Sequence, residues 1–314
     1  MDFESENVIL DCDEAGVRID AWLALALSEE FPDKTFTRSG LKKLIEQGVV
    51  TIGGETVKPS YGMKKGDVVS VKMPEPETLD VFPEDIPLDV VYEDKDIIVI
   101  NKPRGMVVHP APGTRSGTLV NALLHHCEDL SDINGVIRPG IVHRIDKDTT
   151  GLIAVAKNNA SHIKLAEQLS DHTMARVYYA VLEGVPKTEH GTIDMPIGRH
   201  PVDRKKMALN TKNGREAVTH FKVLEVKNNL ALTECRLETG RTHQIRVHMQ
   251  AIGHPIAGDP VYGIKNTRNL AGQLLHAGKL RLIHPGTGEL MEFSAPLPDD
   301  YVEFLKKNQF EVEL

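Results

Sequence analysis

The stretch PGIVHRIDKDTTGLIAVAK, residues 139–157, joins a dense run of polar side chains to an apolar segment. Seven of the eight residues from 143 to 150 are polar, whereas residues 152–156 are all apolar. The pattern predicts a polar loop that leads into a strand. Such a loop is either an ordinary turn or a catalytic loop, because reactive groups are often carried on loops held by a rigid sheet. An aspartate there could be a nucleophile, a base or a metal ligand, and spacing alone does not decide.

The segments around this loop mix strands and helices without a regular order. Strand patterns cover residues 89–103, which form two short strands with a polar turn, and residues 177–186, 216–226 and 230–239. Helical spacing covers residues 118–126, 159–170 and 242–253. In the second of these helices we expect Ile163, Ala166 and Leu169 to face partly inward. The order favours the α+β class, with a mixed or antiparallel sheet, over a doubly wound sheet.

The helix predicted over residues 242–253 begins in a polar segment, LETGRTHQIRVH. Ile245, Met249 and Ile252 form its inward stripe, and Arg246 lies on a different row. Arg241 precedes the helix at the end where the helix dipole disfavours a cation. An anionic partner would explain that arginine, and an exposed helix with solvated charges is the alternative.

The N-terminal quarter of the chain predicts a separate small domain. Residues 16–73 contain two amphipathic helical patterns followed by short strands around a Gly53-Gly54 turn, which is a complete α+β unit. Residues 1–15 are expected to be an acidic lead-in. Residues 74–89 hold four prolines, six acidic residues and no basic ones, so we place a linker at 74–88. The larger domain then covers residues 89–298, and residues 299–314 form a C-terminal tail.

The composition excludes several classes of protein. The formal net charge is −8, which excludes a histone-like basic coat but allows a local basic surface. No apolar run approaches the ~20 residues that cross a bilayer, and the acidic start MDFESENVIL lacks the features of a signal peptide. The three cysteines form no CxxC pair, so neither a disulfide framework nor a zinc site is expected. We expect a cytoplasmic protein without a membrane segment or a metal.

Four motifs, in one order, carry a resemblance to the RluA/RluD-type pseudouridine synthases. HRID-KDTTG resembles the family's HRLDxxTSG signature, and RVYYAVLEG is similar to its K-x-Y-x-A…G strand, with Arg176 in the lysine position. The other two matching segments are NKPRGMVVHP, residues 101–110, and LETGRTHQIRVHMQAIGHPIAGDPVYG, residues 237–263. Residues 16–73 resemble the small RNA-binding domain of the ribosomal-protein S-four type. The resemblance therefore spans residues 16–298.

The resemblance implies an isomerase that breaks the N1–C1′ bond of a uridine in RNA and rejoins C1′ to C5. No group enters or leaves, so no cofactor is expected. Asp146 matches the essential aspartate, which acts as a nucleophile or as a base and is ionised in either role. Arg246 matches the basic residue that pairs with it, Tyr178 the aromatic that stacks on the uracil, and Arg144 the side chain that helps to displace the target base.

The expected partner is ribosomal RNA of the large subunit or its assembly intermediates, bound by a monomer. Residues 101–124 are most similar to the RluD-like subgroup, which modifies 23S rRNA. Arg38, Lys42 and Lys43 match the RNA-facing helix of the small domain. A second basic stretch, residues 199–215, is expected to be a loop or hairpin against RNA, or else a solvated loop. The alternatives are a non-catalytic RNA-binding factor for ribosome assembly and a glycoside hydrolase that pairs Asp146 with Asp148.

Overall fold

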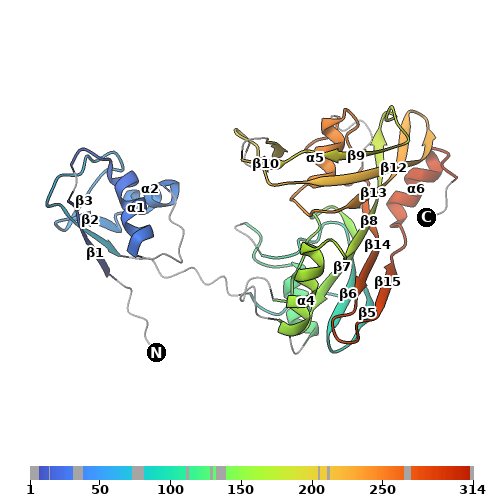
Figure 1. Ribbon diagram of the computed structural model, residues 1–314, viewed down its shortest axis with the longest axis horizontal. Helices are drawn as coiled ribbons and strands as arrows, with labels where there is room; N and C mark the ends of the chain where they lie inside the picture. The colour runs from blue at the N-terminus through green and yellow to red at the C-terminus, as the bar shows by residue number, and fades with distance from the viewer. Residues whose placement is uncertain are drawn as a thin grey trace. The chain divides into compact units, whose positions relative to one another are not determined.

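The computed structural model describes residues 7–13, 15–30, 38–72, 81–110, 113–127, 130–131, 139–203, 206–210, 213–264 and 270–311. The chain divides into two compact units, Met1–Thr78 and Leu79–Leu314 (Figure 1). In the parts of the chain just given, no helix is both long enough and apolar enough to cross a membrane.

The small unit is a four-stranded antiparallel sheet packed on two helices. The strand order is β1-β4-β2-β3, and the core includes Trp22 and Leu23 of α1 and Leu41 and Ile45 of α2. Gly53 and Gly54 turn the chain between β2 and β3 with φ angles of 57° and 87°, which glycine adopts without steric cost. The elements are α1 (Ile19–Glu30), α2 (Arg38–Glu46), β1 (Asn7–Asp11), β2 (Val50–Ile52), β3 (Glu55–Thr56) and β4 (Val68–Lys72).

The prediction of an acidic lead-in over residues 1–15 is wrong for residues 7–11. These residues form β1, which pairs with β4 in antiparallel register, Ile9 opposite Ser70. Val8 and Leu10 pack against the core while Ile9 is exposed. This alternation is the period of a half-buried strand, and the acidic residues around it conceal the pattern in the sequence.

The large unit is built on a nine-stranded mixed sheet, so the predicted α+β class is confirmed. The order is β5-β6-β7-β14-β8-β13-β12-β9, with β15 beside β14. β7 and β14 run parallel, and the other pairs are antiparallel. The strands are β5 (Val90–Glu93), β6 (Ile97–Lys102), β7 (Thr150–Ala156), β8 (Ala175–Glu183), β9 (His190–Asp194), β12 (Val218–Lys227), β13 (Leu230–Leu237), β14 (Leu275–Ile283) and β15 (Leu290–Ser294). β10 (Ile197–Arg199) and β11 (Met207–Leu209) form a separate hairpin.

Helices cover both faces of this sheet. Leu123 of α3 (Leu119–His126) and Met249 of α5 (Gln244–Ala251) pack on the face that carries Tyr178. Leu165 of α4 (Asn159–Ser170) and Tyr301 of α6 (Asp299–Lys307) lie in cores on the opposite face. β7 is therefore buried on both sides, which makes it a rigid base for the loop that precedes it.

The inward stripe predicted for residues 159–170 is wrong in part. Ile163 is 53% exposed and Ala166 is also exposed, whereas Leu169 packs against the core as expected. The buried face instead includes Gln168, whose amide donates to the carbonyl of Ile283 and accepts from its N–H. A polar side chain faces the sheet here because it completes the hydrogen bonds of β14, which hydrophobic periodicity does not reveal.

Part of the stretch predicted as a linker packs against the large unit. Val81 is buried in the core beside α3. The Glu84 N–H donates to the carbonyl of Asn121, and the Asn121 amide donates to the carbonyl of Phe82 over 2.8 Å. Residues 73–80 lie outside the described residues.

Candidate active site

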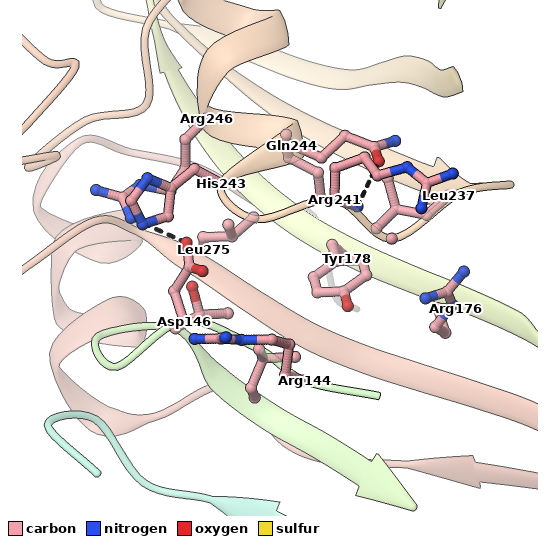
Figure 2. A pocket seen from close by; sticks show the side chains of 14 residues that line it. Arg144, Asp146, Arg176, Tyr178, Leu237, Arg241, His243, Gln244, Arg246 and Leu275 are labelled. Carbon is pink, nitrogen blue, oxygen red and sulfur yellow. Dashed lines mark hydrogen bonds and ion pairs between the residues drawn. The ribbon is translucent and has the colours of Figure 1, made fainter. Parts of the chain in front are cut away.

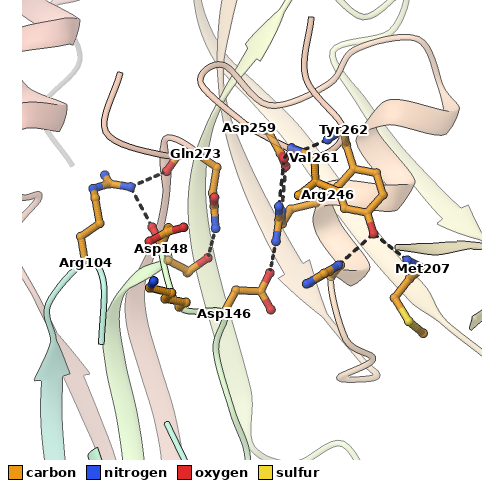
Figure 3. Close-up of polar contacts among 12 residues, drawn as sticks. Arg104, Asp146, Asp148, Met207, Arg246, Asp259, Val261, Tyr262 and Gln273 are labelled. Atoms are coloured by element: carbon orange, nitrogen blue, oxygen red, sulfur yellow. Dashed lines mark hydrogen bonds and ion pairs between the residues drawn. The ribbon is translucent and has the colours of Figure 1, made fainter. Parts of the chain in front are cut away.

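The polar loop before β7 is anchored by the NKPRG segment. Lys102 is fully buried, and its Nζ donates to the carbonyls of Pro103, Met106 and Lys147 over 2.7, 2.8 and 3.0 Å. Arg104 donates to the carbonyl of Asp148 over 2.7 Å (Figure 3). Burial is the largest influence on Lys102 and lowers its pKa to about 7, against the opposing charges of Asp148 and Asp146. The backbone carbonyls of Lys147 and Asp148 are thus held, which fixes the turn that follows Asp146.

Arg246 of α5 connects Asp146 to a second carboxylate. Its Nη1 donates to Asp146 Oδ2 over 2.9 Å, while Nε and Nη2 donate to the two oxygens of Asp259 over 2.7 and 2.9 Å (Figure 3). Burial alone would lower the pKa of Arg246, but the hydrogen bonds and charges of Asp259 and Asp146 raise it. The guanidinium is therefore charged, and its third nitrogen is directed at Asp146.

Asp259 is itself held by backbone groups. Its side chain is fully buried, and Oδ1 also accepts from the N–H groups of Val261 and Tyr262 over 2.8 and 3.0 Å. Burial would raise the pKa of Asp259, but Arg246 and these N–H groups lower it. The carboxylate therefore stays ionised and orients Arg246 before any substrate arrives.

The four residues predicted at the active site line one cavity. Asp146, Arg144, Tyr178 and Arg246 surround a space of about 40 Å³. Figure 2 shows the Tyr178 ring in the middle of this wall, with Asp146 on one side and Arg176 on the other. Tyr178 is 5% exposed, and burial raises the pKa of its hydroxyl. The arrangement can hold a flat ring against Tyr178 with its substituent beside Asp146.

The sequence did not indicate roles for His243 and Tyr262. The Tyr262 hydroxyl accepts from the Met207 N–H over 2.8 Å and lies 2.8 Å from His243 Nδ1. The Arg246 guanidinium lies over the Tyr262 ring, 5.2 Å from its centroid. His243 has a left-handed backbone, with φ of 59°. Tyr262 thus connects the hairpin of β10 and β11 to the start of α5. Tyr262 belongs to the GDPVYG run at the end of the second long motif, and this run is the feature of the sequence that could have indicated its role.

A second, larger cleft adjoins this cavity. It has a volume of about 710 Å³ and shares Arg144, Arg176, Gly240 and Arg241 with the smaller space. Arg215 adds a fourth arginine, and Glu216 is the one carboxylate residue in its lining. Arg241 donates from Nε to the carbonyl of Glu216 over 2.8 Å, so a backbone dipole faces this cation. The cleft is positively charged and opens beside Asp146.

The predicted RNA-binding residues are described only in part. Lys42 is exposed on α2 and lies 3.7 Å from Glu46. Arg38 and Lys43 belong to the same helix, but their side chains lie outside the described residues. In the second basic stretch, residues 204, 205, 211 and 212 are likewise outside them, and the rest includes the hairpin of β10 and β11. β10 and β11 pair with each other, Ile197–Arg199 with Met207–Leu209, and this pairing overlaps the first part of the stretch predicted over residues 199–215.

One group in the described part of the chain has the composition of a metal site, and it lies outside this cavity. Asp94, Asp96 and His284 bring their ligand atoms within 4.8 Å of one another. His284 Nδ1 accepts from the N–H groups of Gly286 and Thr287, and Nε2 lies 2.8 Å from Asp94. Because Nδ1 is an acceptor, Nε2 carries the proton and faces the carboxylate. The group is accounted for as a His–Asp pair that joins the β5–β6 turn to the end of β14.

Comparison with known proteins agrees with this fold and site. Residues 96–251 match the RNA pseudouridylate synthase family, and residues 36–69 match the S4 domain. The chain is 53% identical to an uncharacterized RNA pseudouridine synthase of Bacillus subtilis (strain 168), over 92% of this chain and 93% of that protein. It is 45% identical to the ribosomal large subunit pseudouridine synthase D of Escherichia coli O6:H1, over 93% and 91%. The human RNA Pseudouridylate Synthase Domain Containing 4 superposes with a TM-score of 0.56 at 26% identity, over 71% of this chain and 94% of that one.

The chain belongs to the RNA pseudouridine synthase family. It is an RNA pseudouridine synthase, an intramolecular isomerase, with an N-terminal S4 domain. The resemblance found in the sequence is thereby confirmed, and the glycoside hydrolase and the non-catalytic factor are set aside.

Proposed function

We propose that this enzyme isomerises specific uridines of large-subunit (23S) ribosomal RNA, with Asp146 as the catalytic carboxylate. The observation that carries the proposal is the 2.9 Å ion pair between Asp146 and Arg246 in a cavity that opens beside a cleft lined by four arginines. Relatives named ribosomal large subunit pseudouridine synthase D match more than nine tenths of the chain, which favours large-subunit RNA as the substrate.

Each site residue has a task in this reaction. Asp146 either attacks C1′ or removes the 2′ proton, and both roles need the ionised form that Arg246 stabilises. Tyr178 stacks on the uracil, and Arg144, which is exposed at the mouth of the cavity, helps to displace the base. Extracting a stacked uridine costs a few kcal/mol, which contacts to the flanking RNA offset.

Binding of the surrounding RNA is assigned to the small unit and to the basic cleft. Arg38, Lys42 and Lys43 on α2 contact phosphates, as does the basic stretch around β10 and β11. Such contacts supply affinity with little sequence dependence and weaken as salt rises. The division of the chain into two compact units, Met1–Thr78 and Leu79–Leu314, serves this separation, and the enzyme acts as a monomer.

The test is tritium release from RNA that carries uridine labelled at C5, followed by mapping of the modified positions. Transcripts of 23S rRNA and 16S rRNA are compared at one salt concentration, with the Asp146→Asn variant as the control. We expect release from 23S rRNA alone, at a small number of positions. Release from 16S rRNA only, or none from 23S rRNA either free or assembled in subunits, would contradict the proposed substrate.

A further inference from the structure

Arg176 is a buried cation that no carboxylate neutralises. It lies on β8, two residues before Tyr178, and is 7% exposed. Its one hydrogen bond runs from Nη2 to the carbonyl of Glu238 over 3.3 Å, and its Nε has no partner. Among the residues that the structure describes, no carboxylate forms an ion pair with Arg176. A buried arginine normally has such a partner, because an unpaired buried charge is costly.

The backbone around Arg176 leaves room for its guanidinium. Gly240, in the turn before α5, stands so close that a Cβ there would lie 2.7 Å from Arg176 Nη1. The turn is held in place by Gln244, whose Oε1 accepts from the Thr239 hydroxyl and the Arg241 N–H over 2.8 and 2.9 Å. The guanidinium therefore occupies a formed socket, although burial is the main influence on its pKa and lowers it.

Arg176 lies on the side of the cavity where we expect the base rather than the sugar. Arg176, Tyr178 and Asp146 line the same cavity, and Figure 2 shows Tyr178 between the other two. With the ribose beside Asp146 and the uracil stacked on Tyr178, the base extends away from the ribose toward Arg176. The edge of uracil that lies farthest from the sugar carries a carbonyl oxygen, which is a hydrogen-bond acceptor.

We infer that Arg176 binds the carbonyl edge of the uracil and stabilises the negative charge that the base acquires during the reaction. This inference rests on the roles proposed above for Asp146 and Tyr178. When the N1–C1′ bond breaks, its electron pair leaves with the base, whichever role Asp146 takes. The charge of the uracilate is shared by N1, O2 and O4. C5 then bonds to C1′ and loses its proton, and N1 gains one, so the atoms balance without a co-reactant.

The burial of Arg176 favours the uracil base over an RNA phosphate as its anionic partner. RNA phosphates lie on a solvated backbone, and Arg215, which is exposed in the larger cleft, is suited to them. Arg176 lies where this cleft meets the 40 Å³ cavity and lines both, but it is only 7% exposed, so little of it faces the solvated backbone. A donor that faces the developing charge in a water-poor site contributes far more to the rate than it would in water.

The experiment measures cleavage of the N1–C1′ bond in single turnovers, as loss of the intact target nucleoside from quenched and digested RNA. Two RNAs are compared, with uridine or 5-fluorouridine at the target position, because fluorine makes the base a better leaving group. The variants are Arg176→Met and Arg176→Lys. The control is Arg236→Met. Arg236 is an exposed arginine on the neighbouring strand β13, and its side chain pairs with Glu234. RNA affinity and melting temperature are measured for each protein.

We expect Arg176→Met to slow cleavage of uridine by about 10²–10³-fold, the usual loss for a donor at a developing oxyanion. With 5-fluorouridine the loss should be several-fold smaller, and Arg176→Lys should lie between wild type and Arg176→Met on both RNAs. Arg236→Met should match wild type. The inference would be overturned if Arg176→Met slowed cleavage by the same factor on both RNAs and Arg176→Lys did so as well. It would also be overturned if the loss lay in RNA affinity and vanished when the phosphates flanking the target were replaced by uncharged methylphosphonates.

The Asp146→Asn variant separates this inference from the proposed function. It should cleave neither RNA. If it cleaves both, the role proposed for Asp146 fails, and the inference about Arg176 fails with it. If it is inactive and the Arg176 variants show no dependence on the leaving group, the inference about Arg176 alone is overturned.

Discussion

The two sides of the active-site cavity treat a buried arginine in opposite ways. Arg246 contacts Asp146 and Asp259 with all three nitrogens, whereas Arg176 contacts one carbonyl. Both side chains belong to residues that are less than 10% exposed. The paired side is complete without substrate and keeps Asp146 in place. On our inference, the side around Arg176 gains its partner only when the uracil binds. The contrast therefore indicates that Arg246 positions Asp146, whereas Arg176 faces the negative charge that the base acquires.

The strongest test of the paired side is Asp146→Asn. The substitution keeps the size of the side chain but removes the carboxylate that we propose acts at C1′ or at the 2′ proton. We expect turnover to fall by roughly 10⁴-fold or more, as with other groups that are essential for a chemical step. RNA affinity should change little, because phosphate contacts elsewhere supply it. Single-turnover assays and binding at fixed salt measure the two effects.

Asp148→Asn is the matched control, two residues along the same loop. The structure holds this residue by its backbone, through the hydrogen bond from Arg104 to its carbonyl. The variant should therefore keep measurable activity. A folded Asp148→Asn protein that binds RNA but is inactive would mean that the wrong carboxylate has been assigned.

The second prediction removes the support behind Arg246. Asp259→Asn leaves a buried arginine with one carboxylate, and breaking a buried pair costs ~3–5 kcal/mol of stability. Because Arg246 would no longer be aligned, we expect the single-turnover rate to fall by about 10²-fold, the usual result of a small misplacement. Denaturant unfolding and single-turnover kinetics are the measurements. Asp300→Asn, which breaks the half-exposed pair with Arg104, should cost less than ~1 kcal/mol. Equal effects of the two variants would show that pairing at Arg246 has no special role.

How far the sequence predicts this site depends on how local each contact is. The loop around Asp146 and the start of α5 are short motifs, and the sequence predicts both. Asp259 lies 13 residues after Arg246, and Asp146 lies 100 residues before it. Such partners come together only in the folded sheet, so no periodicity reveals them. The Asp146–Arg246 pair was expected from the family resemblance alone, and Asp259 was not expected as a partner. Arg176 was placed in a motif, but its lack of a partner is a property of the surroundings.

Contacts between segments that are distant in the sequence also explain which strands could not be predicted. β14 lies in the middle of the sheet, parallel to β7 and antiparallel to β8, yet no pattern predicted it. β1 is separated from β4 by more than fifty residues and is an edge strand of five residues. Strands of this kind are specified by their neighbours more than by their own residues. Helices with capping residues are easier to predict from the sequence. An example is α3, where Thr118 and Asn121 form a capping box.

The third prediction concerns Tyr178, which lies between the two arginines. Tyr178→Phe keeps the ring, and Tyr178→Leu removes it. Stacking of a base on an aromatic side chain contributes ~1–3 kcal/mol, so Leu should be roughly 5- to 150-fold slower than Phe on the same RNA. Burial raises the pKa of the Tyr178 hydroxyl, so the group is protonated at neutral pH and is not expected to be a base. Similar rates for Phe and Leu, both far below wild type, would instead assign proton transfer to the hydroxyl.

The last prediction concerns the pH dependence of stability rather than the reaction rate, and it is made for Lys102, a third buried basic side chain, which contacts three carbonyls and no carboxylate. Its pKa is about 7 in the folded protein and ~10.4 in an unfolded chain. Between these values the unfolded chain binds more protons, so the free energy of unfolding rises with pH, by at most about 1.4 kcal/mol per unit. Lys102→Met cannot titrate, so its stability relative to wild type should decrease from pH 7 to pH 10. Urea unfolding across this range measures the difference, with the exposed Lys147→Met as control. Parallel curves for wild type and Lys102→Met would mean that the three carbonyls keep the ammonium charged, and that a buried cation in this protein needs no carboxylate.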